Sequence, residues 1–229
     1  MTIILAGLIT IVSALGSTLL IGLRRREAAV VVNAVGSLVA VAAPIGVDPL
    51  VAVDGASGSV PVQLSLLVGI AGLLHMLGMI GWYDRIWWWD HVTHTVSAAL
   101  IAAIIYAWLL VVGVDTPTAA AVGPKPLTVG LTMLAGIVWE LAEWALRLLS
   151  DRLGIERVVK RYGRFDTPLD ILFDFVGAML VVAVDLRLLA AVFASIPEYA
   201  QLLVSGLLSG LLVAFVVSMM IIVYGYAAW

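Results

Sequence analysis

Acidic and histidine side chains in this chain recur at the spacing of helix turns. Asp90 and His94 are four residues apart, and Glu140 and Glu143 are three apart. A third set follows at intervals of four: Asp166, Asp170 and Asp174. Residues three or four apart share one face of an α-helix. Carboxylates stacked on one face repel each other unless they are protonated or bridged by a cation, so these sets predict a polar site.

The bridging cation is expected to be either an arginine or a metal ion. A divalent metal held by two or three carboxylates and an imidazole fits these side chains, and inward-facing Glu and His hold metal pairs in helix bundles. The predicted metal ligands are His94, Glu140, Glu143 and Asp170. Asp174 and Asp90 are predicted to support the ligands or to act as general base. The alternatives are a carboxylate–arginine network and protonated carboxylates.

Some of these residues also have simpler interpretations. Asp90 stands at the start of an apolar segment and Asp166 lies two residues before a proline, so either aspartate could cap a helix. His75 stands alone in an apolar segment, which favours a hydrogen-bonded packing role. His91 adjoins His94 but points about 100° away on a helix, so His94 is the favoured ligand.

The composition requires a bilayer. Of the 229 residues, 63% are hydrophobic and 12% are charged, whereas soluble domains have about 25% charged residues. The chain has no cysteine, which excludes disulfides, thiolate metal sites and cysteine nucleophiles. The net charge of −3 gives no reason to expect nucleic acid as a partner. The expected surroundings are therefore lipid.

Seven apolar segments have about the length, roughly 20 residues, that crosses a bilayer as an α-helix. They are residues 2–23, 28–46, 62–82, 90–113, 126–149, 168–188 and 200–226. Charged or proline-containing stretches separate them. The prediction is an all-α, polytopic transmembrane bundle of about seven helices, forming a single domain over residues 1–229 in the cell membrane.

The basic residues predict the orientation of the bundle. The first apolar segment precedes Arg24–Arg26, the reverse of the order in a secretory signal, so it is expected to be a retained helix with its amino terminus outside. Ten of the 12 basic residues then fall in cytoplasmic connections, as the positive-inside rule requires; the exceptions are Lys125 and Arg187. The carboxyl terminus is expected to be cytoplasmic. All three acidic sets then lie at one depth, on the cytoplasmic side.

Other features suggest lipid and subunit contacts. Trp82, Tyr83 and Trp87–Trp89 are expected to anchor the membrane interface. Arg161 and Arg164 precede the acidic set at 166–174 and are predicted to hold an anionic head group or phosphate, although a solvated loop is the simpler interpretation. Gly206 and Gly210 form a GxxxG pair, which indicates close helix packing within the chain or in a homo-oligomer.

Three motifs resemble those of the VanZ-like membrane proteins, and more closely those of the YjdF-like group. They are Asp90-x-x-x-His94, Glu140-x-x-Glu143-Trp144 and Asp166-Thr-x-x-Asp170 followed by Gly177. The similarity spans about residues 65–185. It implies a polytopic membrane protein with a link to cell-envelope antibiotic resistance in the VanZ-like branch, and it implies no particular reaction.

Three functions follow as hypotheses. The leading one is a metal-dependent enzyme that hydrolyses an ester or phosphoester of a lipid or lipid-linked substrate in the cytoplasmic leaflet. The second is a proton- or cation-coupled transporter, because such pathways are also built from intramembrane acids. The third is a non-catalytic scaffold subunit whose polar cluster holds three helices together.

Overall fold

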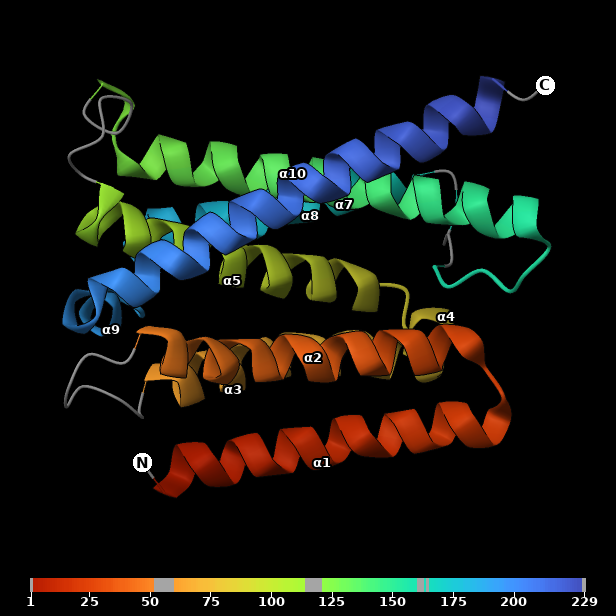
Figure 1. The fold of residues 1–229 in the computed structure, drawn as a ribbon, viewed down its shortest axis with the longest axis horizontal. Helices are drawn as coiled ribbons and strands as arrows, with labels where there is room; N and C mark the ends of the chain where they lie inside the picture. Colours follow the sequence, from red (N-terminus) through yellow and green to blue (C-terminus); the bar gives the residue numbers. More distant parts are fainter. Residues whose placement is uncertain (1, 52–59, 114–120, 160–162, 164, 228–229) are drawn as a thin grey trace.

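All regular structure among the described residues is helical. The computed structural model describes residues 2–51, 60–113, 121–159, 163 and 165–227. Its helices are α1 (Thr2–Arg25), α2 (Ala28–Val51), α3 (Val60–Leu77), α4 (Tyr83–Arg85), α5 (Trp89–Val111), α7 (Pro124–Leu153), α8 (Asp166–Ala183), α9 (Ala190–Ser195) and α10 (Pro197–Ala227) (Figure 1). A π-helical turn, Gly78–Trp82, joins α3 to α4. The predicted all-α bundle is confirmed.

Six helical segments in the described part of the chain are long and apolar enough to cross a membrane. They are Thr2–Arg25, Ala28–Gly46, Val62–Arg85, Trp89–Val111, Pro124–Leu153 and Pro197–Gly225. The remaining predicted segment, 168–188, corresponds to α8, which has 18 residues and carries three aspartates. Figure 1 shows α8 running alongside α7 within the bundle. The chain is a multi-pass membrane protein in which α8 is the most acidic of the long helices.

The helices form two groups. Helices α1, α2 and α3 pack on one another, and α5, α7 and α8 form a second mutually packed set. Helix α10 lies mainly against α7, and α3 contacts α5 to join the groups (Figure 1). Helix α1 begins and α10 ends at opposite ends of the bundle (Figure 1). This agrees with the predicted odd number of crossings.

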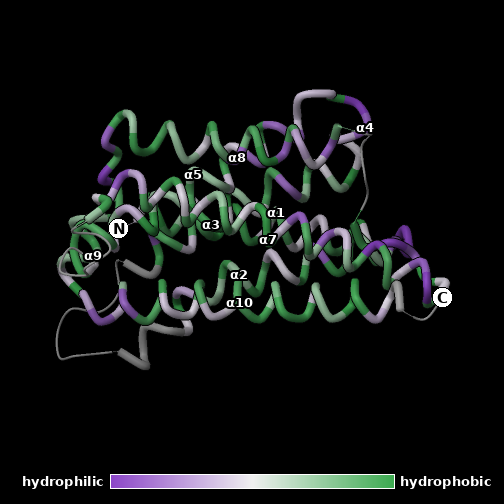
Figure 2. Tube along the Cα trace, turned by 90° about the horizontal axis from the view of Figure 1, so that it is seen from above, coloured by the Kyte–Doolittle hydropathy of each residue, from purple (hydrophilic) through white to green (hydrophobic). Residues whose placement is uncertain are grey.

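The charged connections gather at one end of the bundle. The α1–α2 turn, α4, the end of α7 and the start of α8 all lie there (Figure 1). Figure 2 shows hydrophilic stretches mostly toward the ends of the bundle, with further hydrophilic turns along α7 and α8. Assignment of this end to the cytoplasm remains a prediction from the positive-inside rule.

Two of the expected interfacial aromatics are instead internal. Trp87 is 80% exposed and Trp88 is 44% exposed, as an interface anchor requires. Trp89 is buried, and its indole Nε1 donates to the Leu74 carbonyl oxygen of α3 at 3.0 Å. Tyr83 is also turned into the bundle, where it bonds His75. Interface anchoring therefore remains a prediction for the exposed Trp87 and Trp88, and it does not fit the buried Trp89 or the internal contact of Tyr83.

Small residues divide between internal packing and open faces. A Cβ at Gly69 would crowd Ile11 of α1, so that glycine lets α3 approach α1. A Cβ at Gly206 or Gly210 would meet no described atom within 4 Å. The GxxxG pair of α10 therefore makes no close helix contact among the described residues. Its use between subunits remains a prediction.

Helices α5 and α8 make the most extensive interface in the bundle. Gly177 of α8 faces the α5 backbone so closely that a Cβ there would collide with the Thr95 carbonyl oxygen and lie 2.9 Å from the Ala99 nitrogen. Backbone atoms cannot move aside as a flexible side chain can. The α5–α8 spacing consequently depends on this glycine.

We predict that Gly177→Ala lowers the melting temperature of the protein in mild detergent, because overpacking costs roughly 1–3 kcal/mol. Gly130→Ala is the matched control: Gly130 is an exposed glycine of α7 with no neighbour within 4 Å of an added Cβ, and alanine there should be neutral or slightly stabilising. Thermal unfolding followed by tryptophan fluorescence measures both. Equal melting temperatures for the two variants would contradict the close approach.

Candidate functional site

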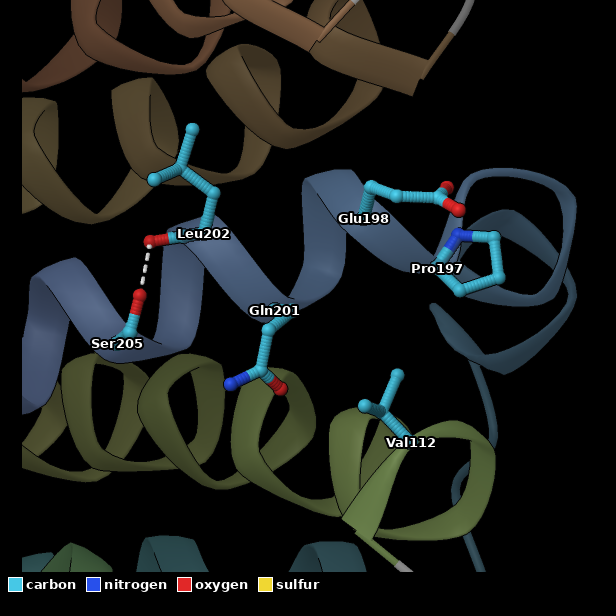
Figure 3. A pocket seen from close by; sticks show the side chains of 6 residues that line it. All are labelled: Val112, Pro197, Glu198, Gln201, Leu202 and Ser205. Carbon is cyan, nitrogen blue, oxygen red and sulfur yellow. Dashed lines mark hydrogen bonds between the residues drawn. The ribbon is translucent and has the colours of Figure 1, made fainter.

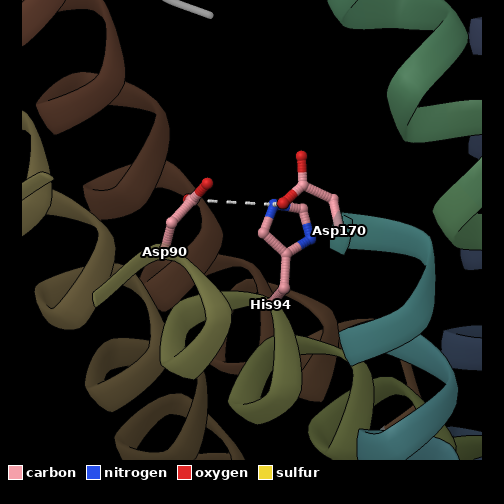
Figure 4. A group of neighbouring side chains, drawn as sticks. All are labelled: Asp90, His94 and Asp170. Atoms are coloured by element: carbon pink, nitrogen blue, oxygen red, sulfur yellow. Dashed lines mark ion pairs between the residues drawn. The ribbon is translucent and has the colours of Figure 1, made fainter. Parts of the chain in front are cut away.

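The imidazole of His94 lies between two carboxylates from different helices. Asp90 and His94 project from the first two turns of α5, and Asp170 projects from α8 (Figure 4). His94 Nε2 lies 3.6 Å from Asp170 Oδ1 and 4.0 Å from Asp90 Oδ1. One potential ligand atom from each residue lies within 4.8 Å of the other two. The structure thus brings three of the predicted site residues into one group.

The second ring nitrogen of His94 has a separate partner. Nδ1 lies 3.1 Å from Asp174 Oδ1, one turn farther along α8 than Asp170. A carboxylate oxygen accepts, so Nδ1 carries the proton that is donated to Asp174. Nε2 is left facing Asp90 and Asp170. Three states fit this arrangement: Nε2 is also protonated and the ring is an imidazolium, one of the two carboxyl groups is protonated and donates toward Nε2, or a cation lies between Nε2 and the two carboxylates.

Two buried carboxylate oxygens have no hydrogen-bond partner among the described residues. Glu140 of α7 is 6% exposed and Asp170 is 3% exposed, and Glu140 Oε1 and Asp170 Oδ1 are the atoms concerned. Thr167, in the first turn of α8, hydrogen-bonds the Glu140 carboxyl group. Buried polar atoms are almost always paired, and an uncompensated buried charge is costly. These two oxygens therefore indicate a missing proton, cation or bound water.

A glycine on α7 brings the third helix to the site. A Cβ at Gly136 would collide with Asp174 Oδ2, so the backbone of α7 lies directly against the Asp174 carboxylate. Gly136 precedes Glu140 by one helical turn and shares its face. The sequence analysis did not assign Gly136 a role. Its place one turn before Glu140 was the signal that could have identified it.

The fourth predicted ligand has a different partner. Arg147 Nη1 donates to Glu143 Oε2 at 3.0 Å, within α7 and one turn apart, with both side chains largely buried. Glu143 is thus part of a carboxylate–arginine pair, the alternative that the spacing left open. Its service as a metal ligand remains a prediction.

The first residues of α5 and α8 show whether Asp90 and Asp166 cap these helices, and a ring contact shows where His91 lies. Trp88 precedes α5 and Phe165 precedes α8, neither with a side-chain cap, so Asp90 and Asp166 lie in the first turns, where negative charge favours the helix dipole. His91 stacks on Phe173 with ring centroids 4.3 Å apart. It does not join the His94 group, as predicted.

The predicted head-group residues Arg161 and Arg164 lie outside the described residues. Their binding of an anion remains a prediction. A shallow, open depression of about 400 Å³ lies at the other end of the bundle. Figure 3 shows its lining from the end of α5 and the start of α10, including Val112, Glu198 and Gln201. It is separate from the His94 group.

The two basic residues outside the predicted cytoplasmic connections converge on one aspartate. Asp185, which follows α8, lies 2.8 Å from Arg187 Nη2 and 3.8 Å from Lys125 Nζ. The Tyr106 hydroxyl donates to the same carboxylate. The Tyr106 hydroxyl and the Arg187 guanidinium hold the pKa of Asp185 below its usual range. This cluster is fully compensated, and it accounts for the positions of Lys125 and Arg187.

The Glu143–Arg147 pair gives a stability prediction. Arg147→Leu leaves the Glu143 carboxylate buried without its cation, and breaking a buried ion pair costs roughly 3–5 kcal/mol, so the melting temperature in detergent should fall. The double variant Glu143→Leu/Arg147→Leu should recover most of that loss, because an apolar pair can replace a buried ion pair at little cost. An unchanged melting temperature for Arg147→Leu would show that the pair is not desolvated.

Comparison with protein families gives one match. The model of DUF2238, described as a predicted membrane protein, matches residues 4–191. The comparison with curated proteins found no match, and no solved structure matched either. The matched range runs from the first turn of α1 to the start of α9 and ends before α10, so it is wider than the 65–185 of the motif resemblance. The chain belongs to the DUF2238 family of predicted membrane proteins.

Proposed function

We propose that Asp90, His94 and Asp170 bind a divalent metal ion, and that the protein is a membrane-embedded, metal-dependent hydrolase of a lipid or lipid-linked ester or phosphoester. One observation carries this proposal. Three potential ligand atoms from two helices lie within 4.8 Å of one another, while the opposite nitrogen of the same histidine is held by Asp174 at 3.1 Å.

The separations support a shared ion. Protein ligands lie about 2.1 Å from a zinc ion or similar divalent metal, so two ligands of one ion lie at most about 4.2 Å apart. The distances of 3.6 and 4.0 Å from His94 Nε2 to the two carboxylates fall within that limit. They are also longer than ordinary hydrogen bonds. Both features favour a cation between the groups.

The surrounding residues fit the same interpretation. A metal-binding histidine usually donates its other N–H to a carboxylate, which fixes the ring and raises its basicity, and Asp174 is placed to accept that bond. Glu140 Oε1 has no hydrogen-bond partner among the described residues. It would supply a further ligand or orient a metal-bound water. Three protein ligands with a position left for water is the arrangement of catalytic zinc sites.

The location suggests the substrate class. Helices α5 and α8 begin toward the end of the bundle where α4 lies (Figure 1), and the His94 group comes from the first two turns of these helices. The positive-inside rule assigns that end to the cytoplasm. A group one or two turns from that end is within reach of lipid head groups. It lies closer to the membrane surface than the substrate sites of carriers, which are usually near the bilayer midplane. The motif resemblance to VanZ-like and YjdF-like proteins would place such chemistry in the cell envelope.

We predict that protein purified in mild detergent binds a single Mn²⁺ or Zn²⁺ ion per chain, and that Asp170→Asn removes this binding. Asp174→Asn should weaken the affinity by roughly 10–100-fold, the usual effect of losing a partner of a ligating histidine. Elemental analysis and titration calorimetry measure the two quantities.

Glu198→Gln is the matched control for the metal experiment. It makes the same kind of change at an exposed carboxylate at the opposite end of the bundle, and its metal content should equal that of the wild type. A well-folded wild type that neither contains nor takes up metal would refute the metal site. The imidazolium interpretation of His94, with a structural role for the cluster, would then be preferred.

We further predict that the metal-loaded protein releases a head group, phosphate or fatty acid from lipids in mixed micelles, measured by mass spectrometry over phospholipids and lipid-linked diphosphates. Asp170→Asn should reduce the rate at least 100-fold, because it removes the ion that activates water. Metal bound without product, together with Mn²⁺ flux into proteoliposomes that Asp170→Asn abolishes, would contradict the hydrolase and indicate a transporter.

A further inference from the structure

A series of hydrogen bonds enters the bundle from the connection after α7. The side-chain amide of Asn33, on α2, donates to the Val158 carbonyl oxygen at 3.1 Å and to the Ala29 carbonyl oxygen at 2.8 Å. Its carbonyl oxygen, Oδ1, lies 3.2 Å from His75 Nε2 on α3. His75 is therefore joined to the rest of the structure through α2, although its sequence neighbours are apolar.

The series continues from His75 to the helix that carries the site. His75 Nδ1 lies 2.9 Å from the Tyr83 hydroxyl of α4, which lies 3.3 Å from Thr93 Oγ1 of α5. Thr93 Oγ1 donates to the Asp90 carbonyl oxygen at 2.7 Å. The series thus ends on the backbone of one candidate ligand, adjacent in sequence to another, His94.

The hydrogen bonds of Asn33 determine which atoms of His75 and Tyr83 donate and which accept. Asn33 donates both amide hydrogens to carbonyl oxygens, so the oxygen facing His75 is an acceptor and His75 Nε2 must donate. In the neutral ring, His75 Nδ1 then accepts from the Tyr83 hydroxyl. Thr93 donates its one hydroxyl hydrogen to Asp90, so the hydrogen in the 3.3 Å contact between Tyr83 and Thr93 is that of the Tyr83 hydroxyl, shared between His75 Nδ1 and Thr93 Oγ1. Tyr83 is consequently fixed from one side by a histidine whose tautomer is set by Asn33.

The backbone around Tyr83 is shaped to seat its ring. Gly81 has φ 129°, a conformation that L side chains rarely adopt, and it kinks the chain within the Gly78–Trp82 turn. A Cβ at Gly78 would collide with the Tyr83 ring. The ring also meets His75 edge-on, with centroids 5.9 Å apart.

We infer that Tyr83 is a positioning residue for the metal site. Through Thr93 it holds the first turn of α5, so that Asp90 and His94 meet Asp170 from α8 at the observed distances. The inference rests on the proposed function for its metal readout. The placement of α5 by Tyr83 can be measured without a metal.

The test compares Tyr83→Phe with wild type in two measurements. Loss of the hydroxyl should weaken Mn²⁺ or Zn²⁺ binding about tenfold, the lower end of the effect of residues that orient ligands. In metal-free protein it should also speed amide hydrogen exchange in residues 89–96, and not in α1, α7 or α10. Tyr224→Phe, at an exposed tyrosine of α10, is the matched control and should change neither quantity.

Thr93 supplies a second pair of variants. Thr93→Val removes the hydroxyl and should weaken metal binding as Tyr83→Phe does, whereas Thr93→Ser keeps it and should retain wild-type affinity. The double variant Tyr83→Phe/Thr93→Val should be no weaker than either single variant, because both interrupt the same series.

The outcomes separate this inference from the proposed function. Unchanged exchange and unchanged affinity in Tyr83→Phe would overturn the positioning role. Faster exchange in every helix, with a lower melting temperature, would also overturn it, because Tyr83 would then serve folding in general. A wild type that binds no metal would refute the proposed function. In that case, faster exchange confined to residues 89–96 would still support positioning of α5 by Tyr83.

Discussion

The arrangement of the polar side chains depends on the free-energy cost of placing charge in hydrocarbon. Each charged side chain inside a membrane needs a partner, a proton or access to water. In the His94 group two carboxylates face one imidazole nitrogen and Asp174 holds the other, so a single histidine serves three aspartates. Glu140 is buried beside them, so the acidic groups there outnumber the basic ones. Helices α5, α7 and α8 enclose these groups, and their close packing keeps them away from lipid.

That packing is achieved with glycine rather than with large apolar side chains. Gly177 allows α8 to touch the α5 backbone, and Gly136 allows α7 to lie against Asp174. In a membrane, helices gain little from burying apolar surface, because lipid is equally apolar, and close backbone contact and hydrogen bonds contribute instead. The same glycines thus determine helix spacing and ligand spacing. A change in either alters the distances around His94.

Hydropathy predicted the helices well, because about 20 apolar residues have few alternatives in a bilayer. Helical spacing also predicted that Asp90, His94 and Asp170 would meet. The pairing of Glu143 with Arg147 was readable from their separation of four residues, and the capping alternatives failed because Asp90 lies two residues after the N-cap of α5 and Asp166 one residue after that of α8. The bonds of His75 could not be predicted, because Asn33 and Tyr83 come from other helices and their approach depends on the Gly78–Trp82 turn.

The two polar clusters at opposite ends of the bundle differ in how their carboxyl groups are compensated. Around Asp185, one carboxylate receives Tyr106, Arg187 and Lys125, and nothing further is needed to neutralise it. The Asp185 side chain is 39% exposed, so water also stabilises its charge. Around His94 the acidic groups outnumber the basic ones, and buried oxygens of Glu140 and Asp170 lack hydrogen-bond partners among the described residues. Protons on these carboxyl groups or a bound cation would each lower the cost of burying them, and a measurement of bound metal distinguishes the two.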